Sequence, residues 1–177
     1  MKFCFRTIRL VLISLALGVL IPQSALQAES APAMMQSVTG QLSSPEQIAR
    51  YIFRNFSYET DRDQFGKDDK WQTPEELLSS RKGDCEDFAF FAAEILKANG
   101  ISSLLINIYG SNFAHTVCVF KENGKYHVID GKEVIRYNAQ SLDELFTMIY
   151  PHWNQAALVG FSSNGNCGQV LKVFDKK

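Results

Sequence analysis

The sequence predicts a single α+β domain in which helices precede an antiparallel sheet, and three observations lead to this fold class. Helical patterns fill the first half of the chain after an N-terminal segment, and strand patterns fill most of the second half. A helix that is apolar nearly all round begins at Cys85, as expected of a buried, central helix. The dipeptide Asn123-Gly124 separates two strand-like runs and is the strongest hairpin signal in the chain.

The first 28 residues have the features of a secretory signal peptide. Lys2, Arg6 and Arg9 give a basic start, and residues 10–21 form a mostly apolar run that is short for a membrane span. Residues 26–28 end in Ala28 and form a tolerable cleavage site. We therefore expect cleavage after residue 28. An uncleaved anchor is the alternative, and the short apolar run argues against it.

The rest of the chain is expected to form one domain. Residues 29–43 are rich in Ala, Ser, Pro, Met and Gln without periodicity, which predicts a flexible lead-in. The folded domain is then expected over residues 44–177. The cleaved chain would carry 15 basic and 19 acidic residues, with no basic cluster. We therefore expect no nucleic-acid partner and, after cleavage, no membrane contact.

Capping signals mark three further helix starts. They begin at Ser44, Thr73 and Ser141, where a side-chain oxygen can accept from the free N–H groups of the first turn. The helix from Ser44 is amphipathic, and the helix from Ser141 is expected to stop before Pro151. Residues 57–70 are polar and contain five acids. We expect a solvated loop there. A calcium loop is the alternative, but the spacing does not fit an EF-hand.

Several segments in the second half have the composition of strands. They are residues 101–109, 113–121, 125–130, 157–161 and 169–174. The hairpin at Asn123-Gly124 pairs Glu122 with Lys125, and counting outward from the turn brings Val117 opposite Asp130. Asp130 then lies diagonally across from His115 on the same face, within side-chain reach.

The other two histidines are less well placed for chemistry. His127 alternates to the face opposite Asp130, and His152 follows Pro151 outside any clear element. We expect both to be ordinary surface or half-buried histidines.

A thiol catalyst needs a thiolate, an imidazole and a group that orients the imidazole, and the sequence offers Cys85, His115 and Asp130 for these roles. The free N–H groups at a helix start favour a thiolate at Cys85, whereas the charges of Glu86 and Asp87 oppose it. A cationic partner is therefore needed, and histidine oriented by an acid is the usual one. The alternative is a buried cysteine and a core histidine without catalysis.

Three cysteines follow the expected leader, so at least one has no intramolecular partner. Export would allow a disulfide between Cys118 and Cys167. Two buried small side chains are the preferred alternative.

Three segments resemble the transglutaminase-like superfamily of papain-like folds, and in particular the bacterial transglutaminase-like cysteine proteinases. They are residues 83–89 (GDCEDFA), 114–117 (AHTV) and 124–130 (GKYHVID), and residues 71–77 also fit. The similarity covers residues 44–130. It implies a papain-like core in which N-terminal helices precede a nucleophile helix packed on an antiparallel sheet. It also implies that the superfamily's catalytic triad falls on Cys85, His115 and Asp130.

The same resemblance implies a candidate calcium site, because some exported members bind calcium beside the nucleophile. Asp84 and Glu86 are the candidate ligands, with Asp87 as a further one, and carboxylate oxygens suit calcium. The preferred alternative is that these acids favour the helix dipole without any metal.

The resulting hypothesis is an exported thiol hydrolase, a peptidase or amidase, acting on a peptide or side-chain amide through a thioester. A protein-glutamine acyltransferase with the same triad and a non-catalytic binding module of the same fold are the alternatives. We expect a protein or peptide substrate and a periplasmic or secreted location. The chemistry requires no cofactor, and calcium is the one candidate.

Overall fold

The computed structural model describes residues 30–160 and 168–176. The expected signal peptide and Cys167 lie outside these residues. The helices are α1 (Ala31–Gln41), α2 (Pro45–Asn55), α3 (Asp61–Phe65), α4 (Pro74–Ser80), α5 (Cys85–Ala98) and α6 (Leu142–Ile149). The strands are β1 (Ser57–Tyr58), β2 (Lys82–Gly83), β3 (Ser103–Gly110), β4 (Ala114–Glu122), β5 (Lys125–Asp130), β6 (Glu133–Ala139), β7 (Trp153–Gly160) and β8 (Gln169–Asp175).

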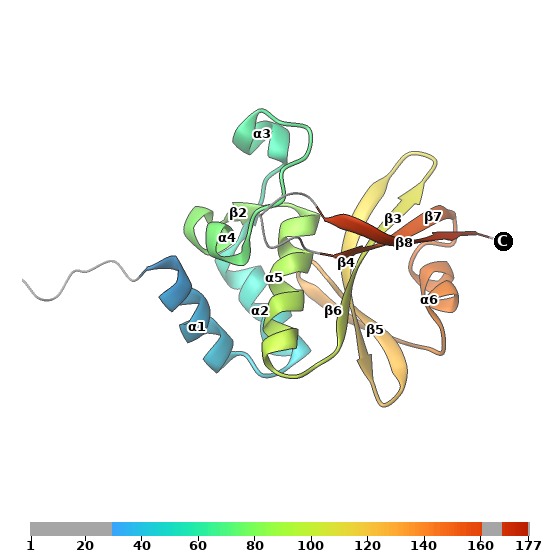
Figure 1. The fold of residues 1–177 in the computed structure, drawn as a ribbon, viewed down its shortest axis with the longest axis horizontal. Coiled ribbons are helices and arrows are strands. Elements are labelled where there is room, and N and C mark those ends of the chain that lie inside the picture. The colour runs from blue at the N-terminus through green and yellow to red at the C-terminus, as the bar shows by residue number, and fades with distance from the viewer. Residues whose placement is uncertain (1–29, 161–167, 177) are drawn as a thin grey trace, which may run out of the picture.

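One antiparallel sheet organises the described part of the chain. Its strands run in the order β6-β5-β4-β3-β7-β8, and every neighbouring pair is antiparallel. Figure 1 shows α1, α2, α4 and α5 gathered on one side of this sheet and α6 on the other. The short strands β1 and β2 form a separate parallel pair at the start of α5. The predicted α+β fold, with the Cys85 helix on an antiparallel sheet, is confirmed.

Two apolar cores lie on opposite sides of the sheet. The larger core surrounds α5, whose Phe91 and Ile95 are fully buried between the sheet and α2 and α4. The smaller core lies under α6, where Phe146 contacts Trp153 of β7. Burial of apolar surface on both sheet faces holds β4 and β5 rigidly, and these strands carry His115 and Asp130.

The predicted helix caps are present. The Ser44 hydroxyl accepts from the Gln47 N–H at 3.3 Å, and the Ser141 hydroxyl accepts from the Glu144 N–H at 3.2 Å. Thr73 and Glu76 form the expected reciprocal capping box. These interactions satisfy first-turn donors that would otherwise lack partners.

The prediction of a flexible lead-in is wrong for most of its length, because α1 occupies Ala31–Gln41. The helix packs against α4 and buries Val38, while Leu42 is buried just beyond its end. The segment has no clear apolar periodicity, so contacts with α4 rather than local pattern stabilise the helix.

The region between α2 and α4 is also more ordered than predicted. The expected solvated loop at residues 57–70 contains β1 and α3, and the side chain of Asp61 is only 4% exposed. Strand β6 was not predicted, and β7 begins at Trp153, before the predicted start at residue 157. None of the helices in the described ranges is long and apolar enough to cross a membrane.

Candidate functional site

The start of α5 is shaped by a close approach that only glycine permits. A Cβ atom on Gly83 would lie 2.5 Å from Oδ2 of Asp87 and 2.9 Å from Cδ1 of Leu77. Gly83 therefore lets β2 pass tightly over the first turn, after which Asp84 takes the N-cap position. Cys85 is the first residue of the helix, as predicted.

Asp87 holds this turn to the loop before α4. Its carboxylate accepts from the backbone N–H and the side-chain amide of Gln72, both at 2.7 Å, and from the Asp84 N–H at 3.3 Å. Burial raises the pKa of Asp87 to about 6 in spite of the bonds from Gln72. Because its acceptor capacity is taken by these donors, Asp87 is a structural acid rather than an open ligand.

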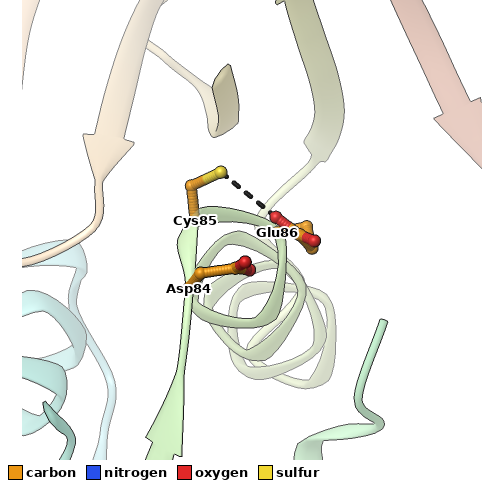
Figure 2. A group of neighbouring side chains, drawn as sticks. All are labelled: Asp84, Cys85 and Glu86. Atoms are coloured by element: carbon orange, nitrogen blue, oxygen red, sulfur yellow. Dashed lines mark hydrogen bonds between the residues drawn. The ribbon is translucent and has the colours of Figure 1, made fainter. Parts of the chain in front are cut away.

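The Cys85 thiol faces a carboxylate in this structure. Its Sγ donates to Oε2 of Glu86 at 3.1 Å, and Figure 2 shows the two groups directed toward each other beside Asp84. Burial, followed by the charge of Glu86, raises the pKa of Cys85 to about 12, although the Thr116 N–H acts in the opposite direction. Burial is thus the largest cause, and of the two acids expected from the sequence to oppose the thiolate, Glu86 does so here.

His115 and Asp130 form a close pair on the sheet. The Nε2 atom of His115 lies 2.7 Å from Oδ1 of Asp130, and each side chain is about a quarter exposed (27% and 26%). The strand register that predicted this pair is confirmed, since Glu122 faces Lys125 and Cys118 faces Ile129. A carboxylate can only accept, so Nε2 carries the proton and Nδ1 is left with a free lone pair.

One cavity brings the cysteine and histidine together. It has a volume of about 350 Å³, and both Cys85 and His115 line it. Its other walls include the aromatic side chains of Tyr58, Trp71 and Tyr109. Asp130 is paired with His115 but does not itself line the cavity. In this structure the thiol is hydrogen-bonded to Glu86, and His115 is paired with Asp130, although Cys85 and His115 line the same cavity.

Carboxylates from two parts of the chain meet beside Cys85. Asp61, from the region predicted to be a solvated loop, groups with Asp69 of the same region and Glu86, and also with Asp84 and Asp87. In each grouping of three, the candidate ligand atoms lie within 4.8 Å of one another. The sequence interpretation missed Asp61 and Asp69. The available signal was the run of acids at residues 57–70, which was set aside because its spacing does not match an EF-hand.

Asp84 is the least satisfied of these acids. Its Oδ1 is buried without a hydrogen-bond partner among the described residues. Burial and the neighbouring carboxylates of Glu86 and Asp61 raise the pKa of Asp84 to about 8. A buried, unpaired acceptor surrounded by like charges is the environment that a bound cation would relieve, so these residues fit a divalent ion with oxygen ligands.

The remaining predicted residues have structural positions. His127 does lie on the face opposite Asp130, but it is buried against Phe120, with ring centroids 5.4 Å apart, so the expectation of a surface or half-buried residue is wrong. His152 is exposed. Cys118 is buried in the larger core, and its proposed disulfide partner Cys167 lies outside the described residues.

The fold and cavity define a papain-like arrangement, with a cysteine at the start of a buried helix and a histidine–aspartate pair on an antiparallel sheet. Residues 34–147 match the family model described as "Transglutaminase-like domain". The match covers more than half of the chain, so the protein belongs to the transglutaminase-like family.

Known proteins are similar to this chain in fold or in part of the sequence. Calcium-bound LapG from Legionella pneumophila aligns with a TM-score of 0.53 and 20% identity, covering 78% of each chain. EGTA-treated LapG aligns with the same score and identity over 82% of this chain and 84% of that one. A protein of Archaeoglobus fulgidus named UPF0252 is 38% identical over 61 residues, which is 33% of this chain and 20% of that protein.

Proposed function

We propose that this protein is an exported thiol hydrolase, a peptidase or amidase, that uses Cys85, His115 and Asp130. The observation that carries the proposal is the 2.7 Å contact between His115 and Asp130 at a cavity that Cys85 also lines. A solitary buried cysteine would not need an oriented imidazole beside it. Membership of the transglutaminase-like family supports the same assignment.

In the proposed reaction, the Cys85 thiol first breaks its hydrogen bond to Glu86 and gives its proton to Nδ1 of His115. The sulfur attacks the carbonyl carbon of an amide, and the backbone N–H at Cys85 is the candidate donor to the oxyanion. His115 then passes the proton to the leaving amine as the C–N bond breaks, which leaves a thioester on Cys85. Water, deprotonated by His115, hydrolyses the thioester and releases a carboxylic acid. Asp130 holds the imidazole in the required tautomer throughout.

The test is the rate of Cys85 alkylation by iodoacetamide against pH, followed by mass spectrometry of the full chain. Glu86 contributes to the raised pKa of Cys85 in this structure, and the proposed move of the thiol from Glu86 to His115 would remove that contribution. We therefore expect wild-type labelling well below the pH of an ordinary thiol with a pKa of ~8.5, and a rate about tenfold lower in His115→Ala. His152→Ala is the matched control, because it removes an exposed histidine away from the cavity. Equal rates in wild type and His115→Ala would favour the non-catalytic binding module.

Adding an amine to an active preparation separates the two enzymatic outcomes. A hydrolase releases a free acid and amine from a peptide substrate, whereas an acyltransferase incorporates the added amine into the product. We propose hydrolysis as the outcome, supported by the analogy with cysteine proteinases of this superfamily.

We further propose that Asp84 and Glu86, together with Asp61 and Asp69, hold calcium. The partnerless Oδ1 of Asp84 and the clustering of four carboxylates support this, and LapG has been solved bound to calcium. Bound calcium would neutralise negative charge around Cys85. Asp87 is not included, because Gln72 and the Asp84 N–H occupy its oxygens.

The calcium proposal is tested by thermal unfolding with and without the ion. Calcium at about a hundred times its dissociation constant should raise the midpoint by roughly 5 °C or more. Asp84→Asn and Glu86→Gln should abolish the shift. Asp68→Asn should keep it, since Asp68 is an exposed neighbour that pairs with Arg62. No shift in the wild type would contradict the proposal.

Export is supported by the basic start and apolar run of residues 1–28. N-terminal sequencing of protein collected outside the cytoplasm should begin at Glu29. An intact Met1 on that protein would support the anchor alternative.

A further inference from the structure

Neutral polar side chains replace the apolar core of the sheet where it reaches the candidate site. On the face of β3 and β4 that packs against α5, Leu105 is paired with Cys118, and both belong to the larger core. The next pair on the same face is Asn107 opposite Thr116. Thr116 is only 5% exposed. Polar side chains buried at this point need hydrogen-bond partners, because an unpaired one would destabilise the fold.

Two hydrogen bonds join this pair to Tyr109, near the end of β3. The Thr116 hydroxyl donates to Oδ1 of Asn107 at 3.0 Å, and Nδ2 of Asn107 donates to the Tyr109 hydroxyl oxygen at 3.2 Å. The direction of both bonds is fixed, because a carbonyl oxygen only accepts and an amide nitrogen only donates. The Tyr109 oxygen is therefore an acceptor here, and no described residue accepts the proton of the Tyr109 hydroxyl.

The free proton of Tyr109 lies on a side chain that lines the cavity. Asn107, Tyr109 and Thr116 all line the same cavity as Cys85 and His115. The pairing of β3 with β7 is irregular directly after Tyr109, and irregularities of this kind re-aim side chains beside active sites. A molecule bound over Cys85 would therefore find a hydrogen-bond donor on this wall.

Charge is distributed unevenly over the walls of the cavity. Its acids all come from the loop before α4 and the start of α5, and they are Asp68, Asp69, Asp84 and Glu86. Among the described lining residues, those contributed by β3 and β4 include no acid. Negative charge that develops on a reacting carbonyl oxygen would be repelled by the acids and stabilised by a neutral donor on the strand wall.

We propose that Tyr109 is a catalytic residue of this site, and that its hydroxyl donates to the reacting carbonyl oxygen of the substrate alongside the backbone N–H of Cys85. Asn107 and Thr116 are positioning residues that hold the Tyr109 hydroxyl. The inference rests on the proposed function, because the carbonyl oxygen gains negative charge only when the Cys85 sulfur attacks the carbonyl carbon.

The test compares two reactions of Cys85 in the full chain, of which only one forms an oxyanion. With p-nitrophenyl acetate, the sulfur attacks the carbonyl carbon and passes its proton to His115. The ester C–O bond then breaks, which releases p-nitrophenolate and leaves an acetyl thioester. With iodoacetamide, the sulfur displaces iodide from the methylene carbon without an oxyanion. Acylation is measured as the p-nitrophenolate release that Cys85→Ser abolishes, and alkylation by mass spectrometry.

Tyr109→Phe keeps the ring and removes the donor. We expect about a hundredfold slower acylation with an unchanged alkylation rate, the size of effect found when one oxyanion donor is removed. Tyr126→Phe is the matched control, because it removes the hydroxyl of a partly buried strand tyrosine outside the cavity, and both of its rates should equal those of the wild type. An equal loss of the two rates in Tyr109→Phe, or no loss in either, would overturn the inference.

A double-mutant cycle tests the positioning role of Thr116. Thr116→Val keeps the shape of the side chain and removes the hydroxyl that orients Asn107. It should slow acylation about fivefold without changing alkylation, and it should have no further effect in Tyr109→Phe. A similar loss of acylation in both backgrounds would overturn the positioning role.

The two reactions also separate this inference from the proposed function. Alkylation that depends on His115, combined with acylation that does not depend on Tyr109, removes the inference and keeps the proposed function. Equal alkylation in the wild type and His115→Ala, with no p-nitrophenolate release that depends on Cys85, removes both.

Discussion

Three neighbouring acids of one motif have different surroundings because they point in different directions from one helix start. Asp87 turns inward and binds Gln72, Glu86 faces the thiol, and Asp84 retains a buried oxygen without a partner. All three acids lie within residues 84–87. The difference arises because successive side chains on a helix are rotated by about 100°, so each meets a different part of the fold.

At the scale of single residues, Gly83 should be the least replaceable position beside the site. Gly83→Ala would place a methyl group against the Asp87 carboxylate and Leu77, at distances well inside van der Waals contact. We expect a loss of about 1–3 kcal/mol in the free energy of unfolding, measured by chemical denaturation. Gly40→Ala is the control: nothing lies within 4 Å of its Cβ position, and an alanine in helix α1 should be neutral or stabilising. Equal stability of the two variants would contradict the tight approach.

At the scale of elements, one arginine joins a helix and two strands across the surface of the larger core. Arg136 of β6 pairs with Glu46 of α2 at 2.6 Å and also with Glu122 of β4. The hydrogen bond from Arg136 lowers the pKa of Glu46 below its ordinary value of 4.5. Since α2 packs on α5, this ion pair contributes to the framework that supports the Cys85 helix.

The Glu46 pair should make a small, pH-dependent contribution to stability. A carboxylate whose pKa is lowered by folding stabilises the protein above its unfolded-state pKa, and this contribution disappears as the pH falls through the folded-state pKa. Glu46→Gln should therefore cost about 0.2–1 kcal/mol near pH 7, because the pair is partly exposed, and nothing once the pH is well below 4.5. Urea denaturation at several pH values measures the difference.

The control for this pair is Glu133→Gln, which replaces an exposed acid of β6 outside the Arg136 cluster. The free energy of unfolding of Glu133→Gln should differ from that of the wild type by an amount that does not depend on pH. If the free energies of unfolding of Glu46→Gln and the wild type differ by the same amount at pH 3 and pH 7, the charge of Glu46 is not the origin of the effect.

At the scale of the whole molecule, the features that the sequence predicted are those that depend on near neighbours. Helix caps at Ser44 and Ser141 and the hairpin at Asn123-Gly124 are local, and counting from that turn was enough to pair His115 with Asp130. The approach of Asp61 to the motif acids depends instead on how a distant segment packs at the start of α5.

The same reasoning explains the missed elements. Helix α1 is stabilised by α4, and the ring of Tyr150 reaches His115 because α6 packs under the sheet on its second face. No local pattern carries either contact, because both are made between segments far apart in sequence. Sequence reasoning therefore located the two strands, the helix and the motif acids of the candidate site, and missed Asp61, Asp69 and Tyr150 beside them.

The two apolar cores should unfold together, because they share the central strands β3, β4 and β5 as a common wall. The chain has two tryptophans, and each reports one core: Trp71 packs against the larger core and Trp153 lies in the smaller. In Trp71→Phe, fluorescence then follows only the α6 side, and in Trp153→Phe only the α5 side.

Within each variant, the fluorescence and far-UV circular dichroism transitions in urea should coincide. A fluorescence midpoint in Trp71→Phe that precedes the loss of secondary structure would mean that the α6 side opens first. The ring contact between Tyr150 and His115 would then be lost before the Cys85 helix is disturbed.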